Sequence, residues 1–99
     1  MEMQKGDIVL SENGRDKGKP FYVLKLEADY LLLVDGKGRQ IEHPKRKKSK
    51  HCSFLLREDS RVAEKIRTDE KLLNSELRRA IAAYKASKHV EKDEDNKGG

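Results

Sequence analysis

The sequence has few of the residues that normally stabilise a fold or carry out catalysis. Its 99 residues include one cysteine, Cys52, two prolines and no tryptophan, and only 34% are hydrophobic. A lone cysteine excludes an intramolecular disulfide, and nothing in the sequence indicates an oxidising compartment. The longest apolar run, Tyr30 to Val34, is far too short to cross a bilayer. Residues 1–5 lack the apolar stretch of a signal peptide. We therefore expect a small cytosolic protein that is packed over only part of its length.

Charge, by contrast, is abundant, and the positive excess lies in one segment. Residues 1–43 carry seven Lys or Arg against eight Asp or Glu, and residues 58–99 carry ten of each. Residues 44–57 carry six Lys or Arg and no acid, and five of these cations lie between Lys45 and Lys50. A positive field concentrated on one patch favours a polyanionic partner, with nucleic acid first and an anionic membrane surface second. The alternative is a solvated lysine-rich loop.

The N-terminal half has the composition of short β-strands separated by turns. Runs of β-branched, aromatic and leucine side chains alternate with clusters of turn residues. Asp35-Gly36-Lys37-Gly38 indicates a tight hairpin, because glycine tolerates positive φ angles, and Pro44 would end the returning strand. Five short strands at this spacing predict a small, highly curved barrel. The predicted strands span residues 8–10, 21–26, 30–34, 39–42 and 53–56.

Beyond Arg57 the apolar spacing becomes that of helices. Leu77, Ile81 and Tyr84 recur at intervals of four and three, which places them on one helical face. Two short helices are expected near residues 60–68 and 75–87, with Asn74 as the N-cap of the second. Residues 88–99 hold mostly charges and glycines and are expected to form a disordered tail. The predicted class is α+β: a β-barrel over residues 1–57, a helical extension over 58–87 and the charged tail.

Glycines and cations are interspersed in the loop that follows the first predicted strand. Gly14 and Gly18 lie four apart, and Arg15, Lys17 and Lys19 surround Gly18. Glycine lets a backbone approach a partner and cations suit phosphate, although lysine-containing turns are common on any surface. In context, "KGDIVLSENGRDKGKPFYVLKL", residues 5–26, resembles the glycine-centred strand–loop–strand unit of KOW-domain RNA-binding proteins.

The next segment extends this resemblance. "YLLLVDGKGRQIEHPKRKKSKH", residues 30–51, is similar to a bacterial family of small KOW proteins that is related to large-subunit ribosomal proteins of eukaryotes and archaea. The resemblance covers about half the chain and implies an SH3-like β-barrel that binds structured RNA, ribosomal RNA in the first place. The glycine-rich loop and the basic run would contact RNA phosphates, and such contacts give affinity and orientation but do not read the base sequence. The candidate RNA-binding residues are Arg15, Lys17, Gly18, Lys19, Lys37, Arg39, Lys45, Arg46, Lys47, Lys48, Lys50 and His51.

Catalysis and metal binding find little support in the residues. His43, His51 and Cys52 lack the paired ligand spacing of a zinc site, and the sequence has no phosphate-loop or dinucleotide fingerprint. We therefore expect a protein that is not an enzyme and uses no cofactor, metal or small-molecule substrate. Four aromatic residues of the predicted strands could stack on bases but are expected in the core: Phe21, Tyr22, Tyr30 and Phe54.

The rival interpretation is a protein-interaction adaptor. SH3-like barrels also bind peptides, and the helical stripe of Leu77, Ile81 and Tyr84 could dock on a partner instead of on the barrel. A membrane-surface role is disfavoured, because the basic run has no interleaved apolar residues to insert. We expect a monomer that binds RNA.

Overall fold

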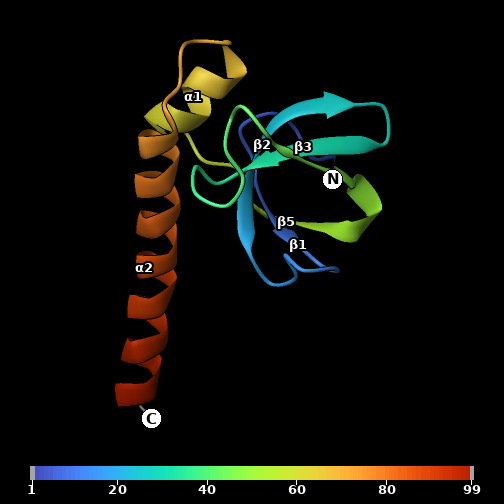
Figure 1. Ribbon diagram of the computed structural model, residues 1–99. Coiled ribbons are helices and arrows are strands. Elements are labelled where there is room, and N and C mark those ends of the chain that lie inside the picture. The colour runs from blue at the N-terminus through green and yellow to red at the C-terminus, as the bar shows by residue number, and fades with distance from the viewer. Residues whose placement is uncertain (1, 99) are drawn as a thin grey trace.

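The chain forms a five-stranded antiparallel sheet followed by two helices (Figure 1), which confirms the predicted α+β class. The structure is a computed structural model that describes the backbone of residues 2–98 and the side chains of residues 2–88. The strands are β1 (Ile8–Ser11), β2 (Pro20–Glu27), β3 (Tyr30–Val34), β4 (Lys45–Lys48) and β5 (Cys52–Leu56). A 3₁₀ turn over Ser49–His51 joins β4 to β5, and the helices are α1 (Arg61–Arg67) and α2 (Asn74–Gly98).

The strand order is β4-β3-β2-β1-β5, so β4 and β5 form the two edges of the sheet. No ladder joins these edges in the described part of the chain, and the closed barrel that the sequence predicts is therefore not formed. The three-residue turn nevertheless connects one edge directly to the other, which requires the sheet to curl strongly. Register shifts at Ile8/Val9 and Val23/Lys25 help, because such bulges bend a strand and increase its twist.

The predicted fourth strand over residues 39–42 is wrong. The Asp35 carboxylate instead accepts the N–H groups of Lys37 and Arg39, at 3.0 and 2.9 Å, and closes a loop. Further along this loop, the N–H of Ile41 donates to the side-chain oxygen of Asn74 at 2.9 Å. With these amides engaged outside a ladder, the strand that pairs with β3 begins only after Pro44.

Two hydrophobic clusters lie on opposite faces of the sheet, because neighbouring strand residues point to opposite sides. One cluster lies between the sheet and the helices and contains Ile8, Tyr22, Val34, Ile66, Leu77 and Ile81. The other fills the opposite side of the curled sheet and contains Val9, Phe21, Val23, Leu31, Leu33 and Cys52. The predicted apolar stripe of the second helix thus packs on the chain's own sheet.

Of the four aromatic residues expected in the core, two are buried there. Phe21 and Tyr22 are each 1% exposed, whereas Tyr30 and Phe54 are only half-buried. Burial raises the pKa of the Tyr22 hydroxyl, and its hydrogen bond of 2.7 Å to Glu58 raises that pKa further. The ring of Tyr30 lies beside Arg46 and Lys48, and the ring of Phe54 lies beside the Arg57 guanidinium.

The first turns of the two helices are stabilised differently. Ser60 caps α1 by accepting the N–H of Ala63, as a helix N-cap does. The predicted cap of the second helix, Asn74, is wrong, because its side chain bonds to the loop residues Ile41 and Glu42 instead. Glu76 reaches back and accepts the N–H of Leu73 at 3.0 Å. The side-chain hydrogen bonds of Asn74 therefore connect the start of α2 to the loop after β3.

The helix α2 extends beyond residue 87, where the sequence analysis ends it. Figure 1 shows its last turns projecting past the sheet. The side chains after residue 88 lie outside the described residues, so the expectation of a disordered tail over residues 88–99 stays a prediction. None of the described helices is both long enough and apolar enough to cross a membrane.

A buried ion pair fixes the N-terminal segment to the chain that leaves β5. Asp7 is fully buried, and its two carboxylate oxygens accept Nε and Nη2 of Arg57, both at 2.9 Å. The N–H of Gln4 also donates to this carboxylate, at 2.7 Å. The hydrogen bonds to Asp7 raise the pKa of the Arg57 guanidinium. The segment before β1 and the segment after β5 are thus joined by charge as well as by the ladder between these strands.

Candidate nucleic-acid interface

The basic run, which is expected from the sequence to form a loop after Pro44, is an edge strand. Lys45–Lys48 form β4, which pairs antiparallel with β3 so that Lys48 lies opposite Tyr30 and Lys47 opposite Leu31. Lysine is a poor strand former, but pairing to a buried leucine-rich neighbour outweighs this propensity. Charged side chains also prevent an edge strand from recruiting another strand. The cations are thus displayed on a strand and alternate in direction.

The outward cations of β4 gather around Tyr30. The Cζ atom of Arg46 lies 3.7 Å from the centroid of the Tyr30 ring, and Nζ of Lys48 lies 5.9 Å from it. Arg46 also contacts Glu27, at 3.4 Å. Both members of this pair are exposed, and such surface pairs contribute little to stability. Arg46 and Lys48 therefore keep their charges at the surface, and the ring holds the guanidinium in a defined orientation.

Lys47 points the opposite way and contacts the β1–β2 loop, residues 12–19. Its side chain is buried, and its ammonium donates to the carbonyl oxygen of Asn13 at 2.7 Å. A Cβ atom on Gly14 would lie 3.5 Å from this ammonium. Lys47 thus joins the basic strand to the glycine-rich loop, and its ammonium is engaged within the protein.

Backbone hydrogen bonds fix the conformation of the β1–β2 loop. The N–H of Gly18 donates to the carbonyl of Ser11 at 2.8 Å, and the N–H of Lys19 donates to Asp16 at 3.0 Å. Gly18 has a φ of +83°, and a Cβ atom there would meet nothing within 4 Å. Glycine is therefore needed at this position for its backbone angle and not for lack of room. The loop exposes three predicted RNA-binding cations: Arg15, Lys17 and Lys19.

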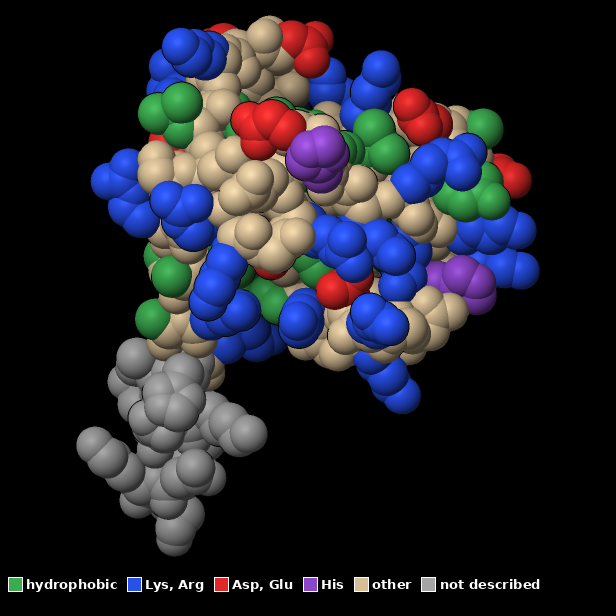
Figure 2. All heavy atoms as spheres, in the orientation of Figure 1, with side chains coloured by type: hydrophobic (Ala, Val, Ile, Leu, Met, Phe, Trp, Pro, Cys, Tyr) green, Lys and Arg blue, Asp and Glu red, His purple; other side chains and the backbone are tan. Residues whose placement is uncertain are grey.

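An ion pair fixes the loop after β3 to the β1–β2 loop. Nη2 of Arg39 lies 3.0 Å from the carboxylate of Asp16, whose side chain is only 11% exposed. The guanidinium of Arg39 is thus partly neutralised, while Lys37 two residues earlier is exposed. Two loops distant in sequence and the strand β4 consequently form one continuous surface. In Figure 2, Lys and Arg side chains gather over the sheet side of the visible face, with a few acidic ones between them.

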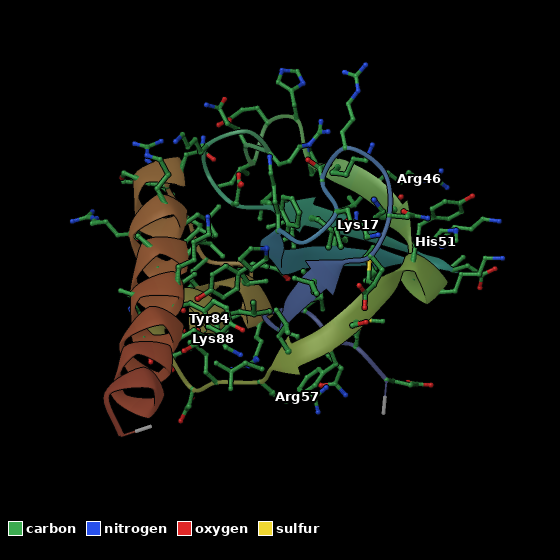
Figure 3. The ribbon with its side chains drawn as sticks, turned by 90° about the horizontal axis from the view of Figure 1, so that it is seen from below. Lys17, Arg46, His51, Arg57, Tyr84 and Lys88 are labelled. Atoms are coloured by element: carbon green, nitrogen blue, oxygen red, sulfur yellow. The ribbon has the colours of Figure 1, made fainter. Side chains whose placement is uncertain are left out.

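The 3₁₀ turn contributes Lys50, which is exposed, and His51, which is half-buried. The carbonyl of His51 accepts the N–H of Glu12 at 2.9 Å, so the turn too contacts the start of the β1–β2 loop. In Figure 3, Arg46 and His51 lie on the side of the sheet away from α2. The structure thus brings the predicted RNA-binding residues together, with the Lys47 ammonium turned inward and Arg39 paired.

Cys52 is an interior thiol. It is 9% exposed, and burial raises the pKa of its thiol even though Lys47 acts in the opposite direction. A raised pKa leaves little of the reactive thiolate at neutral pH. Among the side chains of residues 2–88, no group of three His, Cys, Asp or Glu is arranged to hold a metal ion.

Two features of this surface are missing from the sequence analysis. Tyr30 orients Arg46, and Lys47 points inward; the strict alternation of a strand would have revealed both, had β4 been recognised as a strand. Comparison with known proteins adds no family assignment: no family model matches this chain, and no curated protein matches it either.

Proposed function

We propose that this protein is a non-catalytic RNA-binding protein that holds structured RNA, ribosomal RNA in the first place, by phosphate contacts. The observation that carries the proposal is the hydrogen bond from Lys47 to Asn13, which joins the basic strand to the glycine-rich loop. Around this junction the cations on both elements stay exposed: Arg15, Lys17, Lys19, Arg46, Lys48 and Lys50.

A preorganised set of cations suits RNA better than a flexible tail does. Lysines on a strand or a hydrogen-bonded loop lose less freedom on binding, so more of the electrostatic attraction appears as affinity. Flexible ammonium groups accommodate phosphates of varied position, whereas the stacked guanidinium of Arg46 can form a planar, bidentate contact. The surface is therefore expected to recognise RNA shape and to read few bases.

We further propose that the curled sheet has the SH3-like architecture of the KOW type in an open form, since no ladder joins its two edges in the described part of the chain. The strand order and the short 3₁₀ turn between the two edge strands support this proposal. So does the positive φ of Gly18 in the loop that carries the KOW resemblance. A monomer acting in the cytoplasm fits the charge pattern, and neither a membrane nor a small molecule is needed as a partner.

The alternative function, a protein-interaction adaptor, has less support because its expected docking surface is buried. Its docking surface was to be the apolar stripe of the second helix, but Leu77 is fully buried and Ile81 is 5% exposed against the sheet. Among the described side chains, the large hydrophobic residues that are exposed are Leu26 in β2, Leu56 in β5 and Leu73 before α2. Scattered apolar residues of this kind are normal on a protein surface.

Crosslinking the tagged protein to RNA in cells and sequencing the attached fragments tests the proposal. We expect fragments of structured RNA, with large-subunit ribosomal RNA enriched, and crosslinked peptides from residues 12–19 and 45–51. The matched control replaces Arg15, Lys17, Arg46 and Lys48 with alanine and should recover little RNA. Equal recovery with both proteins, or recovery of neither RNA nor crosslinked peptide, would refute RNA binding at this surface.

A further inference from the structure

A groove lies between the β1–β2 loop and α2, outside the basic surface described above. Its volume is about 440 Å³, within the range of roughly 300–1,000 Å³ that is typical of small-ligand sites. Gly18 lines its rim, and Lys85 and Lys88 line it from α2. Its apolar lining comes from β1, β2, β5 and α2: Leu10, Pro20, Leu55 and Tyr84.

The helix turns an aromatic ring and two cations toward the groove. Nζ of Lys88 lies 5.8 Å from the centroid of the Tyr84 ring, and Figure 3 shows both side chains between α2 and the sheet. Tyr84 is half-buried, whereas both lysines are exposed. The described lining holds two cations and no carboxylate. A flat apolar floor with positive charge at its edge complements a flat, uncharged group attached to an anion.

A second hollow continues this groove toward the predicted RNA surface. Lys85 lines both hollows, and Lys37, Arg78 and Asp35 line the second one. Arg78 is held there by a hydrogen bond of 2.8 Å to the carbonyl of Gly36. Cations consequently extend from the β1–β2 loop along α2 to the loop after β3. Another hollow, of about 470 Å³, differs, because Asp69 and Glu70 lie there beside Lys5, Lys25 and Lys65.

We propose that this groove takes one unpaired nucleotide of the bound RNA, an inference that rests on the proposed function. The base lies on the floor formed by Leu10, Pro20 and Tyr84, and its phosphate lies between Lys85 and Lys88. Structured RNA offers such nucleotides in loops and bulges, where bases stack on aromatic side chains. The open space around the Gly18 Cβ position leaves room for the neighbouring backbone of the RNA. The helix α2 is then the second wall of the RNA site.

A single fluorophore tests the placement of the base. The chain has no tryptophan, so Tyr84→Trp puts its sole indole at the groove. The probes are a short oligoadenosine RNA and an oligomer of the same length built from abasic ribose phosphates. The fluorescence anisotropy of the indole reports the binding of each oligomer. We expect the oligoadenosine to quench the indole emission and to bind about 5-fold or more tightly than the abasic oligomer. Equal affinity without quenching overturns the proposal.

A charge variant with a matched control tests the placement of the phosphate. In the wild-type background, Lys85→Ala/Lys88→Ala removes the contact to one phosphate and should flatten the dependence of log affinity on log salt by about 0.7 for the oligoadenosine. The control, Lys71→Ala/Arg79→Ala, removes the same charge from exposed positions outside the groove and should leave the slope unchanged. If both variants keep the wild-type slope while alanines in β4 reduce it, the groove proposal falls and the RNA proposal stands. If the wild type binds neither oligomer nor structured RNA, both fall.

Discussion

The ammonium of Lys47 in β4 lies 2.7 Å from the carbonyl oxygen of Asn13 in the β1–β2 loop, and this contact connects the two halves of the basic surface. One lysine of the run thus serves the fold, while its neighbours Arg46 and Lys48 point outward. The molecule places like charges next to one another because the strand alternates their direction and a backbone carbonyl accepts one of them.

Replacing Lys47 with methionine should destabilise the protein more than the same change at Lys48. Methionine preserves the apolar stem but removes a charged hydrogen bond in a buried setting, which costs roughly 1.5–3 kcal/mol. The free energy of unfolding from denaturant titration measures this difference. Lys48→Met serves as the control and should lie within about 0.5 kcal/mol of the wild type, because that side chain is exposed. Similar losses in both variants would show that the Asn13 contact contributes nothing to stability.

Gly18→Val should weaken RNA binding while leaving the sheet folded. A β-branched residue at a φ of +83° is strained and should distort the loop at a cost of about 1–3 kcal/mol. Gly38→Val is the matched control, since Gly38 also has open space around its Cβ position but no positive φ. Circular dichroism and RNA affinity are measured for both. If Gly18→Val binds as the wild type does, the loop only connects two strands.

The loop after β3 supplies a stability prediction. A Cβ atom on Gly36 would overlap the backbone carbonyl of Asn74 and approach Leu77 of α2, so Gly36→Ala should separate the helix from the sheet. We expect a loss of several kcal/mol, typical of overpacking combined with a positive φ. Thermal unfolding of Gly36→Ala and of Gly38→Ala tests this contrast. A Gly38→Ala protein as unstable as Gly36→Ala would contradict the docking geometry.

Acid should destabilise the junction between α1 and α2. The Lys65 ammonium, 2.6 Å from the Glu76 carboxylate, lowers the pKa of that carboxyl below its usual 4.5, and the N–H of Leu73 lowers it further. Because the folded-state pKa is depressed, this contribution is complete above the unfolded-state pKa and is lost as pH falls through the folded-state value. The free energy of unfolding should therefore drop below about pH 4.5, and less steeply in Glu76→Gln. Parallel pH profiles for the two proteins would argue against the pair.

Much of the fold follows from local patterns in the sequence. The runs at Phe21 and Tyr30 and the three-and-four spacing of Leu77, Ile81 and Tyr84 identify two strands and a helix, because burial of one face imposes its period on the sequence. The candidate binding residues come from three segments, 14–19, 36–39 and 45–51, which are rich in cations and, in the first two, in glycine.

The fourth strand was not predictable, since its residues are all cationic and only pairing with β3 makes them a strand. The same tertiary dependence hides Asn74, which resembles a cap but bonds to Ile41 across a gap of 33 residues. The groove at Tyr84 depends on how α2 docks against Leu10 and Pro20, which no local pattern encodes. In each case the structure is fixed by a partner distant in sequence.

The most direct test of the account is the salt dependence of RNA affinity when the cations of β4 other than Lys47 are removed. The variant Lys45→Ala/Arg46→Ala/Lys48→Ala leaves Lys47 and its bond to Asn13 intact, so the loop should stay in place. Each phosphate contact contributes about −0.7 to the slope of log affinity against log salt for single-stranded RNA. The account predicts a slope flatter by up to about 2 units and an unchanged circular dichroism spectrum. A control that removes three exposed cations of the helical region, Arg61→Ala/Lys71→Ala/Arg79→Ala, should keep the wild-type slope. A β4 variant that retains both the affinity and the slope of the wild type would contradict the account and move the RNA site away from this strand.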